Sequence, residues 1–254
     1  MADPSLAVVI PVYNEGEAVV ARLREVTAVL AGGPGRAAPL IAVDDGGSDT
    51  SPAALDRWAG ESPAVTVVHH PSNQGYGAAL RTGAVRAGEL GCDWVLFMDS
   101  DLTNPPADIG RFRAVLDGPF ELVKASRYMP GGGVDGVPWS RRIVSVVGNR
   151  SAAMLSGLPI TDLTNGFRAI RTEAFLAMPL QERGFPVILE ELYWAARMGL
   201  RMTQIPSVLA NRSGDQRPSA FGYRPAVVAA YARYAGLMAA DRLRPSRKEQ
   251  PAWR

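Results

Sequence analysis

Two carboxylates, Asp99 and Asp101, stand two residues apart directly after the apolar run 95–98. Neighbouring carboxylates repel each other, and holding them beside a buried core costs free energy unless a cation lies between them. Because residues two apart in an extended segment point the same way, both side chains can face one cation. One interpretation is a metal site, with Asp99, Asp101 and Thr103 as candidate ligands. The alternative is a turn that uses aspartate for local hydrogen bonds.

A buried strand must place this pair at the edge of a sheet. Apolar runs typical of such strands fall at residues 6–10, 40–43, 65–69, 94–98 and 121–125. Helical spacing of apolar residues, or a helix-start signal, lies between them at residues 15–30, 49–60, 73–89 and 107–116. Strands alternating with helices predict an α/β fold, with a mostly parallel sheet covered by helices on both faces.

Polar residues gather where these strands end. Tyr13 and Glu15 follow the first strand, Asp44 and Asp45 the second, residues 73–77 the third, and the Asp99 pair the fourth. Ligands of parallel sheets bind beyond the carboxyl ends of the strands. The turns at the opposite edge carry no comparable polar set, so the sequence predicts one functional crevice.

The second half of the chain is less regular. It offers a glycine-rich loop at 131–133, a helical pattern at 137–158, a loop and strand at 162–171, a helix at 190–198, a strand at 202–205 and a last helix at 221–243. We find no internal repeat and no linker. We expect a catalytic domain at 1–220, followed by a C-terminal helix and basic tail at 221–254.

Composition narrows the class of protein. The 254 residues are 47% apolar and 20% charged, which is typical of a globular protein. A net charge of +2 does not argue for nucleic acid. Cys92 is the only cysteine, so no intrachain disulfide is possible and a reducing compartment is expected. We find no signal peptide and no run of about 20 apolar residues, and therefore expect a cytoplasmic protein. His69 and His70 are interpreted as structural.

Six motifs occur in an order that resembles a known family. They are IPVYNE at 10–15, VDDGGSD at 43–49, NQGYGAALRTG at 73–83, MDSDLTNPP at 98–106, SRYMPGGG at 126–133 and DLTNGFRAIR at 162–171. Together they resemble the family 2 inverting glycosyltransferases with a GT-A fold, over about residues 5–212. The branch that looks most similar is the dolichyl- or polyprenyl-phosphate mannose and glucose synthases.

The resemblance implies a nucleotide-sugar donor, GDP-mannose first and UDP-glucose next, together with Mg²⁺ or Mn²⁺. A hard cation held by carboxylates would neutralise the departing diphosphate. By position, the resemblance implies donor contacts at Pro11, Tyr13, Glu15, Asp44, Asp45, Gly75, Asp99, Ser100, Arg212 and Arg217. Gly75 would let backbone approach the ligand, although a helix-start turn explains it equally well.

The resemblance also implies a polyprenyl phosphate acceptor, which would be met by arginines whose planar fork suits phosphate. The candidates are Arg127, Arg141, Arg142 and Arg168. For Arg127 the alternative is an ordinary ion pair, and for Asp162 with Arg168 it is a structural pair. We expect Asp101, Arg127, Asp162 and Glu190 to be catalytic. Asp162 or Glu190 would act as the base only if the acceptor were a hydroxyl.

Two stretches depart from the branch. Its Gln-x-Glu is replaced by Ile188, Leu189 and Glu190, and its Ser-Lys clamp by a shifted stretch, 212–219, in which Arg217 stands for lysine. These departures leave two rivals: the same fold acting on a soluble hydroxyl acceptor, and a non-catalytic nucleotide-binding subunit of a membrane complex. The tail 241–254 carries five basic and two acidic residues. It is either a peripheral contact with the inner face of the plasma membrane or a solvated tail.

Overall fold

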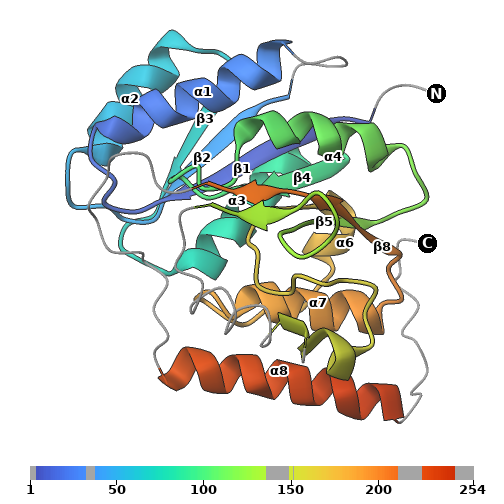
Figure 1. Ribbon diagram of the computed structural model, residues 1–254. Helices are drawn as coiled ribbons and strands as arrows, with labels where there is room; N and C mark the ends of the chain where they lie inside the picture. Colours follow the sequence, from blue (N-terminus) through green and yellow to red (C-terminus); the bar gives the residue numbers. More distant parts are fainter. Residues whose placement is uncertain (1–3, 33–37, 136–148, 151, 211–224, 244–254) are drawn as a thin grey trace.

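The computed structural model describes residues 4–32, 38–135, 149–150, 152–210 and 225–243 (Figure 1). The main strands are β1 Leu6–Val12, β2 Leu40–Asp44, β3 Val65–His69, β4 Trp94–Phe97, β5 Leu122–Ser126, β7 Arg168–Arg171 and β8 Met202–Pro206. They form one sheet in the order β3–β2–β1–β4–β7–β5–β8. All neighbours are parallel except β7, which runs antiparallel to β4 and β5. The expected α/β class is confirmed.

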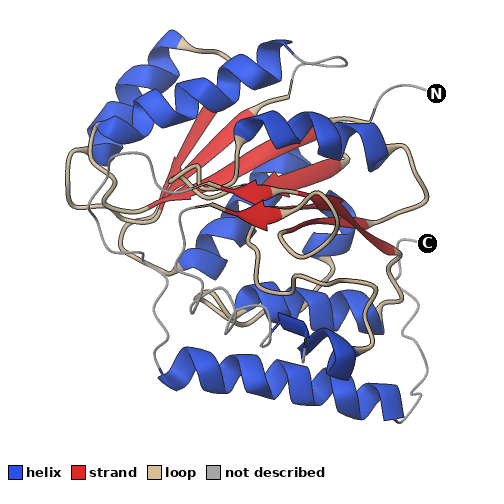
Figure 2. Cartoon of the chain, viewed as in Figure 1, coloured by secondary structure: helices blue, strands red, loops and turns tan. Residues whose placement is uncertain are grey.

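Helices cover both faces of this sheet (Figure 2). One face carries α1 Ala18–Gly32, α2 Ser51–Glu61 and α4 Ile109–Leu116, which follows the short 3₁₀ turn Pro106–Asp108. The other face carries α3 Tyr76–Glu89, α6 Thr172–Leu176 and α7 Val187–Arg197. Strand alternation explains the division: within β1, Val8 and Ile10 pack toward the first set, and Ala7 and Val9 toward the second.

The C-terminal helix α8, Pro225–Leu243, packs against α7 on the side away from the sheet (Figure 1). Its Tyr234 and Met238 join the apolar cluster that contains Leu192 of α7. Among the described residues, no helix combines the length and the apolar character needed to cross a membrane. The expected start of this helix at 221 lies outside the described residues, as does most of the helical pattern expected at 137–158.

Several elements differ from the sequence expectation. The helix expected at 190–198 begins at Val187, directly after Pro186, a residue that fits the start of a helix. The glycine-rich stretch ends in a two-residue strand, β6 Gly133–Val134, which pairs with β9 Val208–Leu209. The pattern predicted a loop and strand at 162–171. The place of β7 between β4 and β5 depends on pairing with segments that are distant in sequence.

The reversed strand β7 brings two buried cations together. Arg168 is in register with Phe97 of β4 on one side and with Lys124 of β5 on the other, and both cationic residues are fully buried. Arg168 donates to the carboxylate of Glu191 in α7 through Nε at 2.8 Å and Nη2 at 2.6 Å. Its guanidinium also lies over the Phe97 ring at 4.7 Å. The bidentate geometry satisfies a charge that burial would otherwise make costly.

Lys124 has a smaller set of partners. Its ammonium group donates to the backbone carbonyl of Asn165. Burial, with the nearby charge of Arg168, lowers the pKa of Lys124 from 10.5 to about 7, against the opposing charges of Asp162 and Glu191. The fold therefore holds this lysine close to the point at which it loses its proton.

We predict that Glu191→Leu destabilises the fold, because it leaves Arg168 buried without its carboxylate. Loss of one partner of a buried ion pair costs about 3–5 kcal/mol of unfolding free energy. The double substitution Arg168→Met/Glu191→Leu should recover most of that loss, since no unpaired charge remains. Urea denaturation followed by circular dichroism measures both variants.

The matched control is the exposed pair Arg24–Glu61, whose side chains are 56% and 64% exposed at 2.8 Å separation. Glu61→Leu should change the unfolding free energy by less than about 1 kcal/mol. A Glu191→Leu loss no larger than this control would contradict the role given to the buried pair.

We also predict that the stability of the protein rises with pH above about 7 through Lys124. Between the folded pKa of about 7 and the reference value of 10.5, the unfolded chain binds one proton more than the folded chain at this residue. The contribution is a rise of up to about 1.4 kcal/mol per pH unit. Lys124→Met removes it, so the unfolding free energy of wild type minus that of the variant should rise as pH increases from 7 to 9.5. Parallel pH curves would refute the buried, easily deprotonated lysine.

Candidate active site

The turn after β4 holds the Asp99 pair by local contacts. β4 ends at Phe97, and Leu102 has a positive φ of 51°. The amide and the hydroxyl of Thr103 donate to Asp101 Oδ1 at 3.1 and 3.0 Å, and the Tyr76 hydroxyl donates to Asp99 Oδ1 at 3.0 Å. The turn, rather than strand alternation, places these carboxylates, which corrects the expectation. Thr103 serves as a support of Asp101.

Glu15, after β1, and Arg22, in α1, hold Ser100 in the middle of this turn. Arg22 of α1 donates through Nε to the Ser100 carbonyl at 2.9 Å and through Nη2 to Glu15 Oε2 at 2.7 Å. The Ser100 hydroxyl donates to Glu15 Oε1 at 3.2 Å. Glu15, expected in the nucleoside pocket, therefore braces the Asp-Ser-Asp turn. The sequence analysis did not single out Arg22; its place one turn inside the helix that follows IPVYNE was the available signal.

The carboxylates after β2 are turned toward two histidines. Asp44 lies 2.8 Å from His69 Nδ1 and accepts from the Gly47 amide at 2.9 Å. Asp45 lies 2.7 Å from His70 Nδ1. Both aspartates are buried, and each lies against a histidine, which agrees with a structural role of His69 and His70.

His69 bridges two acids, because its Nε2 lies 2.9 Å from Asp56 Oδ1. Partial burial opposes the charged ring, but hydrogen bonds and charges of Asp44 and Asp56 outweigh it and raise the pKa of His69. As pH falls, the His69 ring becomes protonated and forms an ion pair with Asp44.

The segment 73–77 is fixed by Asp45 and by the backbone of residues 182–183. Asp45 accepts from the amides of Gln74 at 2.9 Å and Gly75 at 2.8 Å. Gly75 has a φ of 97°, and a Cβ there would lie 2.4 Å from the carbonyl oxygen of Arg183. A Cβ on Gly77 would lie 2.2 Å from the carbonyl oxygen of Glu182. These glycines admit the backbone of residues 182–183, which corrects the expectation that Gly75 opens space for a ligand.

Glu190 of α7 holds the neighbouring segment 181–182. It is buried and accepts from the amides of Gln181, at 2.9 and 3.0 Å, and of Glu182, at 2.8 Å. A carboxylate committed to three amide contacts acts as a structural anchor. This geometry is at odds with the expectation of a catalytic base at Glu190.

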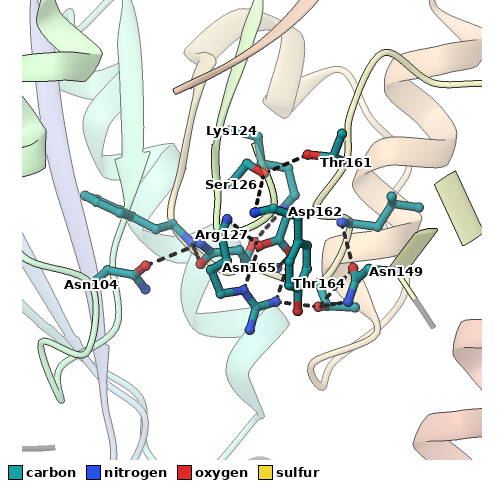
Figure 3. A network of polar contacts seen from close by, with 12 residues as sticks. Asn104, Lys124, Ser126, Arg127, Asn149, Thr161, Asp162, Thr164 and Asn165 are labelled. Atoms are coloured by element: carbon teal, nitrogen blue, oxygen red, sulfur yellow. Dashed lines mark hydrogen bonds and ion pairs between the residues drawn. The ribbon is translucent and has the colours of Figure 1, made fainter. Parts of the chain in front are cut away.

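Arg127 follows β5 and is clamped by Asp162 (Figure 3). Its Nε and Nη2 donate to the two carboxylate oxygens at 2.6 and 2.8 Å, and its backbone amide donates at 3.1 Å. Burial alone would raise the pKa of Asp162, but the hydrogen bonds and charge of Arg127 outweigh it and hold that pKa below its usual range. Asp162 is thus a poor proton acceptor, and its partner is Arg127 rather than Arg168.

The turn 162–165 connects this clamp to the segment after β4 (Figure 3). Thr164 accepts from Arg127 Nη2 at 2.9 Å, and the Asn165 side chain donates to Asn104 Oδ1 at 3.3 Å. The Lys124 ammonium group donates to the Asn165 carbonyl. The clamp is therefore hydrogen-bonded to Asn104, which lies three residues after Asp101 in the same segment. A lysine inside an apolar strand was the signal that the sequence analysis did not use.

The remaining predicted site residues divide into three groups. Pro11 lies within β1, and Tyr13, just beyond it, is 48% exposed at the predicted crevice. Arg168 is fully buried on Glu191, which contradicts its expected contact with the acceptor phosphate. Outside the described residues lie Arg141, Arg142, Arg212 and Arg217.

Comparison with known proteins agrees with this architecture. The model of the Glycosyl transferase family 2 matches residues 7–177. The undecaprenyl-phosphate mannosyltransferase of Micrococcus luteus is 30% identical over 218 residues, which cover 83% of this chain and 86% of that protein. The polyprenol monophosphomannose synthase of Mycolicibacterium smegmatis is 31% identical over 212 residues, which cover 81% of this chain and 77% of that one.

Among solved structures, the fold is similar to that of glucosyl-3-phosphoglycerate synthase from Mycobacterium tuberculosis, in complex with Mn²⁺, UDP and phosphoglyceric acid. The TM-score is 0.65 at 22% identity, and the match covers 92% of this chain and 79% of that one. At this identity the likeness concerns the fold. With the family match over most of the described sheet, the chain belongs to glycosyl transferase family 2 and is a glycosyltransferase with a GT-A fold.

Proposed function

We propose that the protein transfers one hexose, with inversion, from a nucleotide sugar to a polyprenyl phosphate, with Mg²⁺ or Mn²⁺ as cofactor. The observation that carries the proposal is the hydrogen-bonded link from the Arg127–Asp162 clamp, through Asn165, to Asn104, which lies three residues after Asp101. Two relatives are named as mannose transferases acting on undecaprenyl phosphate and polyprenol. GDP-mannose is therefore the favoured donor, and UDP-glucose is next.

The donor set fits a metal that arrives with a diphosphate. Asp99 and Asp101 are partly exposed and offer the hard oxygen ligands that Mg²⁺ and Mn²⁺ prefer. Among the described residues, no group of three or more His, Cys, Asp or Glu side chains forms a metal set. Diphosphate oxygens and water would complete the shell, as is usual for Mg²⁺. The bound cation would neutralise charge on the departing nucleoside diphosphate.

The positions of the carboxylates favour a phosphate acceptor over a hydroxyl. A hydroxyl nucleophile needs a base within hydrogen-bond reach, whereas a phosphate is already anionic. Asp162 is bound to Arg127 and Glu190 to backbone amides, so neither expected base is arranged to take a proton. Arg127, with a side chain 15% exposed, would instead orient the acceptor phosphate by charge and hydrogen bonding.

Two other functions make different predictions. A transferase for soluble hydroxyl acceptors would be active without lipid or detergent. A non-catalytic nucleotide-binding subunit would show no turnover as pure protein. The C-terminal stretch 241–254, with its basic excess, would support peripheral contact with an anionic membrane surface. Assays with polyprenyl phosphate, the matching polyprenol and soluble sugars, using both GDP-mannose and UDP-glucose, separate the three functions.

Asp101→Asn should abolish metal-dependent nucleotide binding while leaving the fold intact, because the substitution removes the charge and keeps the shape. Calorimetry of GDP and UDP binding, with and without Mn²⁺, measures this. Asp117→Asn, at an exposed position after α4, is the control and should bind as the wild type does. Equal Mn²⁺-dependent affinity in Asp101→Asn and wild type would refute the metal role.

Arg127→Lys should lower kcat/KM for polyprenyl phosphate roughly 100-fold, because lysine cannot reproduce the forked contact with Asp162 and the acceptor would be misplaced. Nucleotide affinity should stay unchanged. Arg111→Lys is the control, since Arg111 is 53% exposed and pairs with Asp108. An unchanged kcat/KM for polyprenyl phosphate in Arg127→Lys would contradict the assignment of this arginine to the acceptor.

A further inference from the structure

We propose that Tyr76 is a positioning residue for Asp99, and that the buried Arg168–Glu191 pair fixes the Gly166 backbone beside both side chains. The inference rests on the proposed function, because it assumes that Asp99 meets a cation. It assigns a role to the tyrosine in the NQGYG motif and a new role to Arg168, which burial removes from the acceptor.

The direction of the hydrogen bonds supports this role. The Tyr76 hydroxyl lies 3.0 Å from Asp99 Oδ1, and a carboxylate oxygen accepts, so the hydroxyl donates. Arg168 fixes the backbone beside this contact, because its Nη1 donates to the Gly166 carbonyl at 2.7 Å. The single proton of the Tyr76 hydroxyl is directed to Asp99.

The surroundings hold the ring in place. Tyr76 stacks on Phe185 with ring centres 4.7 Å apart and planes at 24°. Gly166, just before β7, leaves room on the other side: a Cβ there would lie 3.0 Å from the Tyr76 hydroxyl oxygen and 3.1 Å from Asp99 Oδ2. The stack and the close approach of Gly166 leave the hydroxyl little freedom to leave Asp99.

A neutral donor suits a metal ligand better than a cation would. A lysine or arginine on Asp99 would neutralise the carboxylate and compete with the divalent ion. A phenol orients the same oxygen without adding a positive charge. Partners that orient metal ligands in this way typically matter by 10- to 100-fold in metal affinity.

Tyr76→Phe tests the inference, because it keeps the stack on Phe185 and removes only the hydroxyl. Mn²⁺ is titrated by calorimetry and by electron paramagnetic resonance into protein saturated with GDP or with UDP, whichever binds. We expect the Mn²⁺ affinity to fall about 10-fold, with little change in the melting temperature of the metal-free protein. Tyr193→Phe is the control: that hydroxyl accepts from Arg197 at 3.2 Å, far along α7 from the Asp99 turn, and its loss should leave the affinity unchanged.

Phe185→Leu separates the hydroxyl from the packing of the ring. It removes the stack and keeps the hydroxyl. It should therefore lower the melting temperature, while the Mn²⁺ affinity falls less than in Tyr76→Phe. An equal loss of affinity in Phe185→Leu and Tyr76→Phe would overturn the inference in favour of packing. Wild-type affinity in Tyr76→Phe would overturn it while the metal-dependent transferase stands. If wild type showed no Mn²⁺-dependent nucleotide binding, the proposed function would fall together with the inference.

Discussion

The need to balance charge inside the sheet is the constraint on which the site depends. Arg168 and Lys124 lie fully buried on neighbouring strands, where an unpaired cation would cost several kcal/mol. Glu191 pairs with Arg168 through a bidentate contact, and the Asn165 carbonyl accepts a hydrogen bond from Lys124. Each partnership also fixes a part of the site. The first fixes Gly166 beside Tyr76 and Asp99, and the second fixes the turn 162–165 that clamps Arg127.

Local patterns predicted most of the fold. Apolar runs and helical spacing located β1 to β5 and α1 to α4 within a few residues, because these elements bury one continuous set of side chains. The reversed strand β7 depended on pairing between segments that are far apart in sequence, and no local pattern reports such pairing. The family resemblance supplied the GT-A fold, which the comparisons confirm.

The polar residues after β1, β2 and β4 lie at one edge of the sheet, as expected, but a residue type does not reveal its partner. Asp162 binds Arg127 rather than Arg168, Glu190 binds backbone, and Gly75 makes room for another loop. Each of these assignments requires the three-dimensional neighbour, because a carboxylate has the same sequence signature as a base, an anchor or a clamp. The donor, acceptor and metal roles therefore rest on the experiments above.

The reversed direction of β7 has a consequence for how members of such a fold diverge. A parallel strand delivers the loop that follows it to the ligand edge, whereas β7 delivers the loop that precedes it, residues 162–167. The downstream connection, through α6, emerges at the opposite rim. Exchange of the loop 162–167 would therefore change residues at the ligand edge of the sheet, whereas exchange of the connection that follows Arg171 would change residues at the opposite rim.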